Sequence, residues 1–138
     1  MSIPDDDQSA FLKRFAARIN EENRGAEKKV RLRKLQAGKE ARRLCRLFVA
    51  ADAGLEKVIL YGSLLPGRPF RMDSDIDLAL VGGNLATFLA IAESSSFPVD
   101  VIPLDEVRSG IRAFIESEGI VLYKTPPSGM NTYETQRN

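Results

Sequence analysis

The sequence contains no histidine, no tryptophan and only one cysteine, Cys45, among its 138 residues. A single cysteine excludes an internal disulfide, and without histidine the chain cannot build a zinc site of the Cys/His kind. The same absence excludes Ser-His-Asp and Cys-His nucleophilic catalysis, because both need an imidazole base. Any metal must therefore bind to oxygen ligands. We expect Cys45 to serve in packing.

Long hydrophobic runs are also lacking. No apolar run approaches the roughly 18 residues of a membrane helix, and the first residues are acidic where a signal peptide would be basic. We therefore expect a cytoplasmic protein without a membrane contact. The length, together with 43% hydrophobic residues, favours one globular domain that buries a core.

The net charge of +1 hides an uneven distribution along the chain. Residues 1–50 contain 13 Lys and Arg against 7 Asp and Glu, whereas residues 51–138 contain 7 against 12. A solvated basic helix against an acidic body explains this pattern most simply, and RNA binding is the minor alternative.

The first part of the chain has helical periodicity. Apolar residues from Phe11 to Ile19 predict a short first helix, and the polar stretch 20–25 predicts its end. A second helix is expected over 26–52, either continuous or divided near Gly38. We assign residues 1–40 to an N-terminal helical extension that packs on the core, dimerises or contacts a partner.

Strands and helices alternate after this extension. Strands are predicted at 57–61, 75–81, 99–102 and 120–123. One helix is expected after an N-cap at Asn84, and a last helix after a cap at Asp105. The apolar residues of that last helix are expected to face inward; they are Val107, Ile111, Phe114 and Ile115. The pattern predicts an α/β or α+β fold, a small mixed sheet flanked by helices over 41–124, with a disordered tail at 125–138.

Three aspartates are the first candidate site. Asp75 and Asp77 are two residues apart on a predicted strand, so both project to one face while Ile76 projects to the core. Asp100 lies between two valines and adds a third carboxylate if its strand neighbours the first. Carboxylates so close repel one another unless a cation neutralises them. Three hard oxygen ligands suit Mg²⁺ or Mn²⁺.

The second candidate is the turn Gly62-Ser63 at the end of the first strand. Glycine lets the backbone approach a ligand, and the serine offers a hydroxyl and an N–H group to a phosphate. A triphosphate between this turn and a metal on the carboxylates would be placed for in-line attack at its α-phosphorus.

In this order the motifs resemble the DNA polymerase β-type nucleotidyltransferases, and among them the small, antitoxin-like minimal nucleotidyltransferases. The matching segments are Val58–Ser63, Ser74–Leu78 and Val99–Val101. The resemblance implies that Asp75, Asp77 and Asp100 bind metal and that Gly62 and Ser63 bind the triphosphate. The sequence departs from the family where Leu64-Leu65-Pro66 replaces the usual basic residue, so Arg68 and Arg71 are expected to supply positive charge.

By this resemblance the chain is an enzyme that transfers NMP from an NTP, with ATP expected, to a hydroxyl of a macromolecular acceptor, and releases pyrophosphate. A protein acceptor is favoured because the short chain has no evident acceptor-binding domain. The alternative is a weak or inactive binding module, the antitoxin-like partner of a HEPN-type protein. The motif order does not match phosphatases of the haloacid type, and metal-dependent glycosyltransferases typically need a longer chain.

Overall fold

The computed structural model describes residues 5–126. The elements follow in the order α1 (Asp5–Ala51), β1 (Leu55–Tyr61), the 3-10 turn η1 (Gly62–Leu64), β2 (Ile76–Gly82), α2 (Leu85–Glu93), β3 (Val99–Pro103), the 3-10 turn η2 (Leu104–Glu106), α3 (Ser109–Glu118) and β4 (Ile120–Lys124). The strand order is β3-β2-β1-β4. Strand β1 runs antiparallel to β2 and β4, whereas β2 and β3 are parallel. The predicted mixed sheet with flanking helices is confirmed.

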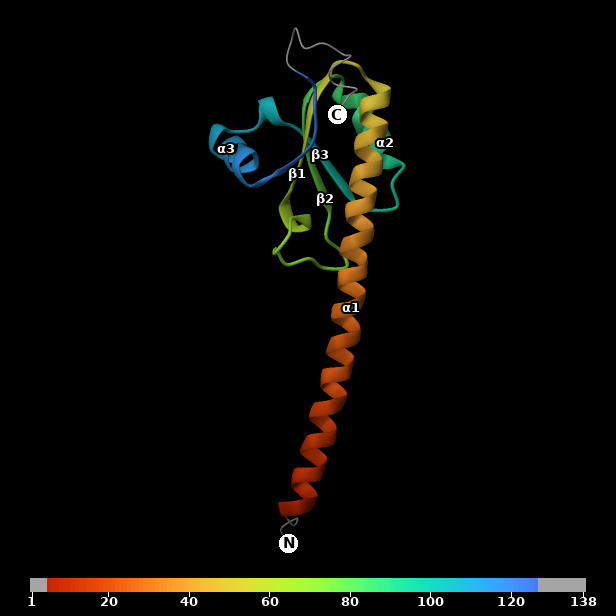
Figure 1. Ribbon diagram of the computed structural model, residues 1–138, viewed down its shortest axis with the longest axis vertical. Helices are drawn as coiled ribbons and strands as arrows, with labels where there is room; N and C mark the ends of the chain where they lie inside the picture. Colours follow the sequence, from red (N-terminus) through yellow and green to blue (C-terminus); the bar gives the residue numbers. More distant parts are fainter. Residues whose placement is uncertain (1–4, 127–138) are drawn as a thin grey trace.

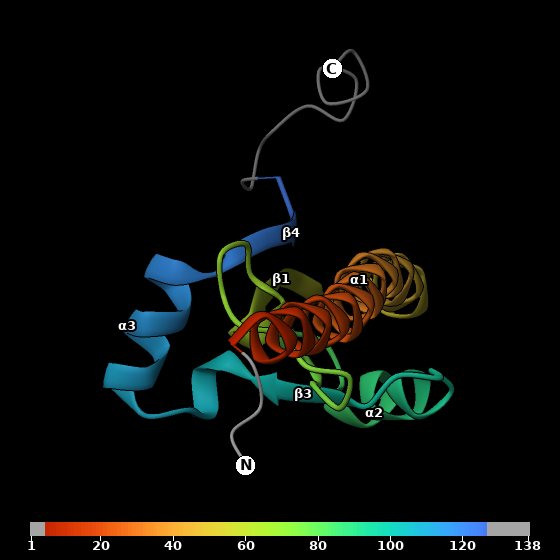
Figure 2. The same ribbon diagram turned by 90° about the horizontal axis from the view of Figure 1, so that it is seen from below.

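Helices cover both faces of this sheet. Helices α1 and α2 lie on one side and α3 lies on the other (Figure 2). The larger apolar cluster forms under α1 and α2, where the rings of Phe48 and Phe88 meet edge to face at 5.3 Å between centroids. A smaller cluster under α3 contains Ile59, Ala79, Leu104 and Ile115. None of the helices in residues 5–126 has the length and apolarity needed to cross a membrane.

Helix α1 is continuous, so the predicted end of a first helix at 20–25 is wrong, and of the two alternatives at Gly38 the undivided helix is the one observed. Gly25 and Gly38 both lie inside the helix. A helical glycine costs only about 1 kcal/mol relative to alanine, and no proline stands between residues 5 and 51 to break the hydrogen bonding. The helix runs through residue 40 without a loop, and its first half extends well beyond the sheet (Figure 1). The division into an extension and a domain at that residue stays a prediction.

The start and orientation of the last helix also differ from expectation. Asp105 lies in η2 and does not cap α3, whose first residue is Ser109. Its carboxylate instead pairs with Arg112 at 3.1 Å. Ile111 and Phe114 are half exposed, because α3 packs on the sheet through a narrow stripe in which Ile115 alone is buried. Of the predicted disordered tail, residues 127–138 lie outside the described residues.

The start of α2 is as predicted. The Asn84 side chain accepts a hydrogen bond from the backbone N–H of Ala86 at 2.9 Å, which caps the helix. Asp52 adds a link that the sequence did not suggest: its carboxylate accepts from the N–H groups of Gly54 and Asn84, at 2.8 and 2.7 Å. The end of α1 and the start of α2 are thereby tied together.

Candidate active site

The strand register brings two of the three predicted aspartates together. Asp77 near the start of β2 is the Cα partner of Asp100 on parallel strand β3 and of Tyr61 on antiparallel strand β1. All three therefore lie side by side across the sheet. The apolar neighbours of Asp77 in β2, Ile76 and Leu78, are buried in the larger cluster, so Asp77 projects to the opposite face as the alternation predicted.

Asp75 occupies a different position from the one expected. It lies just before the first residue of β2 and is exposed, whereas the sequence placed it on the strand. It remains next to Asp77 at the mouth of the same cleft.

That cleft has a volume of about 580 Å³. Of the seven residues that the sequence predicted as a site, six line it, and they are Gly62, Ser63, Arg68, Arg71, Asp75 and Asp77. Asp100 is not part of the lining but stands beside Asp77 on the next strand. The cleft thus combines a turn with backbone N–H groups, two arginines and three carboxylates, since Asp73 lines it as well.

Only glycine fits at the turn. Gly62 has a φ of 80°, in the left-handed region that favours glycine. A Cβ atom at this position would also overlap the carboxylate of Asp77. Gly62 therefore sets both the direction of the chain leaving β1 and the space in which the Asp77 side chain lies.

The electrostatics of the site favour an added cation. Burial first, and then the charges of Asp100 and Asp75, raise the pKa of Asp77 to about 6. Burial, followed by the charges of Asp77 and Asp100, raises the pKa of the Tyr61 phenol. Within residues 5–126 no lysine or arginine forms an ion pair with Asp77. The negative charge is left without a protein counter-ion.

These donors fit a divalent cation in chemistry, but they do not form a complete cage. In the part of the chain that the structure describes, no three acidic or cysteine side chains lie close enough together to hold a metal ion. Magnesium needs less, because it is commonly held by one or two carboxylates, waters and substrate phosphates. Asp77 with Asp75 or Asp100 supplies that smaller set of ligands.

No protein-family model matches the chain, and no curated protein matches its sequence. A solved structure of the toxin–antitoxin MntA-HepT, in a mutant form, matches with a TM-score of 0.52 at 21% identity, over 62% of this chain and 73% of that one. This chain shares the fold of that structure, which bears out the expected fold class.

Two further solved structures are similar to parts of the chain. A toxin–antitoxin with AMP-PNP is 25% identical with a TM-score of 0.44, over 52% of this chain and 63% of that one. Another MntA-HepT structure is 20% identical with a TM-score of 0.42, and the match covers 69% of this chain and 73% of that one.

Lys34 holds the loop that carries the cleft arginines, and the sequence gave no signal for it. The Lys34 ammonium on α1 donates hydrogen bonds to the carbonyl oxygens of Leu65 and Arg68, at 2.9 and 3.0 Å. A lysine in a basic helix looks like one more solvated charge. Only the fold places it beneath this loop.

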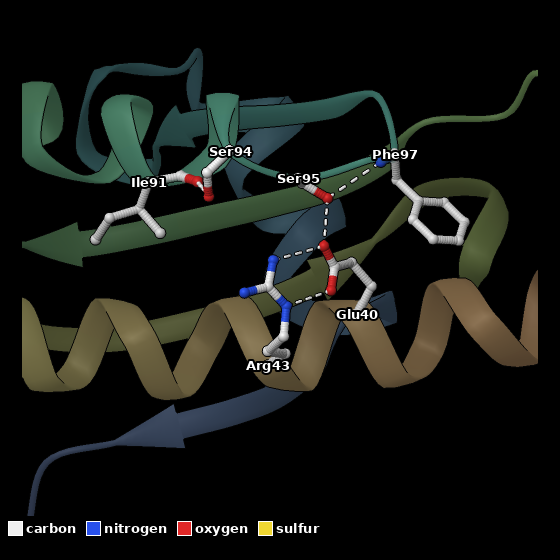
Figure 3. Close-up of polar contacts among 6 residues, drawn as sticks. All are labelled: Glu40, Arg43, Ile91, Ser94, Ser95 and Phe97. Carbon is white, nitrogen blue, oxygen red and sulfur yellow. Dashed lines mark hydrogen bonds and ion pairs between the residues drawn. The ribbon is translucent and has the colours of Figure 1, made fainter.

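A second contact fixes the segment that leads into β3 (Figure 3). Glu40 on α1 accepts hydrogen bonds from Arg43, at 2.5 and 2.8 Å, and from the Ser95 hydroxyl. Ser95 in turn accepts from the backbone N–H of Phe97 at 3.2 Å. These contacts hold the chain two residues before β3, and thereby support the register that sets Asp100 beside Asp77.

Proposed function

We propose that this chain is a metal-dependent nucleotidyltransferase. It transfers NMP from an NTP, with ATP as the expected donor, to a hydroxyl of a macromolecular acceptor, in the first place a protein. The observation that carries the proposal is the cleft that joins the Gly62-Ser63 turn to Asp75 and Asp77, with Asp100 on the neighbouring strand. Residues 41–124 are proposed as the nucleotidyltransferase domain and residues 1–40 as its extension.

Each group in the cleft has a proposed role. Asp77, together with Asp75 or Asp100, would hold Mg²⁺ or Mn²⁺, which neutralises phosphate charge when bound. The turn binds the triphosphate through its N–H groups, and Arg68 and Arg71 add positive charge. The acceptor oxygen forms a bond to the α-phosphorus, the bond to the bridging oxygen breaks, and pyrophosphate leaves. The proton of the acceptor hydroxyl passes to the Asp100 carboxylate.

Label transfer tests this proposal. The purified chain is incubated with Mg²⁺, a lysate of its source, and ATP, GTP, CTP or UTP labelled at either the α- or the γ-phosphate. Transfer of α-label but not γ-label to an acceptor supports nucleotidyl transfer, and Asp77→Asn must abolish it. Asp105→Asn, a substitution of an aspartate in η2 that does not line the cleft, is the matched control and should retain transfer. Transfer of γ-label, or full activity in Asp77→Asn, contradicts the assignment.

A second candidate function is a binding module without turnover, the antitoxin-like partner of a HEPN-type protein. What favours it is that no three acidic side chains within residues 5–126 are grouped closely enough to hold a metal ion. The matched structure, a toxin–antitoxin, adds a precedent for this fold in such a pair. A stable complex with a helical partner whose affinity is the same for Asp77→Asn, together with no label transfer from any NTP, would support this function over catalysis.

A further inference from the structure

The side chains of α1 that the structure describes before Ala26 are all exposed. Phe11, Leu12 and Phe15 are 65%, 61% and 55% exposed, and the two aromatic rings stack only on each other. No other element lies beside the first half of the helix (Figure 1). A solitary helix is marginal in water because most helical stability in proteins comes from packing of an apolar face. Residues 5–29 therefore need a surface to cover that face.

The exposed apolar residues continue the stripe by which α1 packs on the sheet. At 3.6 residues per turn, Leu12 and Val30 fall on the same line along the helix as the buried Phe48, and Phe15 lies about 60° away. Val30 already packs against the larger cluster. The stripe of Leu12, Phe15, Ala26 and Val30 thus leaves the core and runs along the projecting segment. We call it the extension stripe.

Charge along the helix favours one orientation of a partner. The first turn of α1 has the sequence Asp5-Asp6-Asp7, and residues 28–34 contain five basic residues and no acidic one. A second copy laid antiparallel brings the acidic start of each helix to the basic stretch of the other. A parallel arrangement places like charges together, which is unfavourable.

We propose that the chain forms a homodimer in which the projecting halves of two α1 helices pack antiparallel along their extension stripes. The segment over residues 5–30 is about 39 Å long, enough for several turns of contact with its mate. Each helix starts where the other meets its own sheet. At that place a groove of about 430 Å³ lies between α1 and the cleft loop, lined by Ala26, Glu27, Val30, Arg31 and Phe70. Phe11 of the second copy is of a size to enter this groove.

A second copy fits better than an acidic polymer. Nucleic acid would use the basic residues and leave the extension stripe bare, whereas an antiparallel mate covers the stripe and pairs the charges at both ends. The dimer also places the second copy against the loop that carries Arg68 and Arg71, since Phe70 belongs to both the groove and that loop.

The oligomeric state of the full chain in solution tests the proposal. Light scattering after gel filtration should give twice the chain mass of 15.3 kDa at micromolar concentration. Leu12→Glu/Phe15→Glu should give the monomer mass and keep the circular dichroism of the folded sheet, because neither side chain touches the sheet. Ala10→Glu/Ala17→Glu adds the same two charges to the opposite side of the helix and should stay dimeric. A monomeric native chain, a chain that associates only with added RNA or protein, or a dimer that survives Leu12→Glu/Phe15→Glu overturns the proposal.

Spin labels test the orientation. One spin label is placed at Ala10→Cys or, in a second variant, at Ala17→Cys, each in a Cys45→Ala background; both positions lie on the side of the helix away from the extension stripe. In an antiparallel dimer that sets residue 5 opposite residue 30, the two labels at position 10 are offset along the helix axis by about 22 Å and those at position 17 by about 2 Å, so the distance at position 10 should be clearly the longer one. A parallel dimer has no such offset at either position, so equal distances overturn the proposal.

Discussion

On the face of the sheet covered by α1 and α2, the described side chains of β1 and β2 are apolar and buried, with Phe48 and Phe88 at their centre. On the α3 face the buried cluster is small, and Tyr61, Asp77 and Asp100 occupy the end of the sheet that α3 leaves open. The same strands supply both faces, because successive side chains along a strand point to opposite sides of the sheet. The first face therefore carries most of the stability, while the second keeps charged groups that cost stability.

The largest expected effect comes from removing a ring from the stabilising face. Phe48→Ala deletes a side chain with no exposed surface and should lower the free energy of unfolding by about 3–5 kcal/mol. The matched change on the other face is Phe114→Ala, where the ring is 50% exposed. We expect it to cost less than about 1.5 kcal/mol. Denaturant titration of both variants measures the difference, and equal losses would contradict the contrast between the two faces.

The next largest effect is expected at the turn beside Asp77. Gly62→Ala puts a Cβ atom at a positive φ, which costs about 1–2 kcal/mol, and also displaces the Asp77 carboxylate. A displacement of about 1 Å in a site of this kind lowers turnover by roughly 100-fold. Label transfer and thermal unfolding measure the two effects separately.

Gly67 offers the control for this substitution. It has a φ of 77°, close to that of Gly62, but open space around its Cα atom. Gly67→Ala should therefore lose similar stability and keep activity. If both variants lose activity to the same degree, loop strain and not the position of Asp77 explains the effect.

A smaller effect, with the opposite sign, is expected at Asp77 itself. In metal-free protein the pKa of Asp77 is raised to about 6, above the value of an unfolded aspartate, so the folded state binds the proton more tightly. Stability from this group is present at pH 4 and is lost as the pH rises through about 6. Asp77→Asn should remove that loss and raise the stability at pH 7 by about 1 kcal/mol, allowing for solvent screening of a half-buried group.

Thermal unfolding between pH 4 and pH 8 in the presence of a chelator tests this sign. The native chain should lose stability over this range by more than Asp77→Asn does. Adding Mg²⁺ at pH 7 should stabilise the native chain and leave the variant unchanged, since ligand binding to the folded state alone raises its stability. A variant less stable than the native chain at pH 7 would show that the carboxylate makes a favourable contact.

The sequence was sufficient for the strands because their signals are local. Alternation around Asp77 and the apolar run before Gly62 each fix a strand and the face of its side chains. The helices were harder to delimit. Gly25 and Gly38 suggested breaks in α1, yet neither glycine removes a backbone hydrogen bond, and burial of the stripe from Ala37 to Phe48 stabilises the helix around Gly38.

The sequence predicted those cleft residues that lie within short motifs, such as Gly62-Ser63 and the pair Asp75 and Asp77. The pairing of Asp77 with Asp100 needed the strand order, which the sequence left conditional on their strands being neighbours. Lys34 gave no signal, because its role depends on a loop 31 residues away reaching the side of α1. A side chain that donates hydrogen bonds to backbone carbonyl groups far along the chain leaves no motif by which the sequence could reveal it.

The smallest effect is expected for the contact by which Lys34 on α1 holds the loop of the cleft. Lys34→Met keeps the length of the side chain but removes its hydrogen bonds to Leu65 and Arg68. We expect a loss of about 0.5–1 kcal/mol in stability, because the freed carbonyl oxygens can reach water. The loop should then hold Arg68 less firmly and raise the KM for the triphosphate, up to roughly fivefold, with a smaller change in kcat. Lys39→Met on the same helix makes no such bond and is the control. A fall in kcat at an unchanged KM would place the effect of Lys34 on the reacting groups, while equal KM values for the two variants would leave the loop independent of α1.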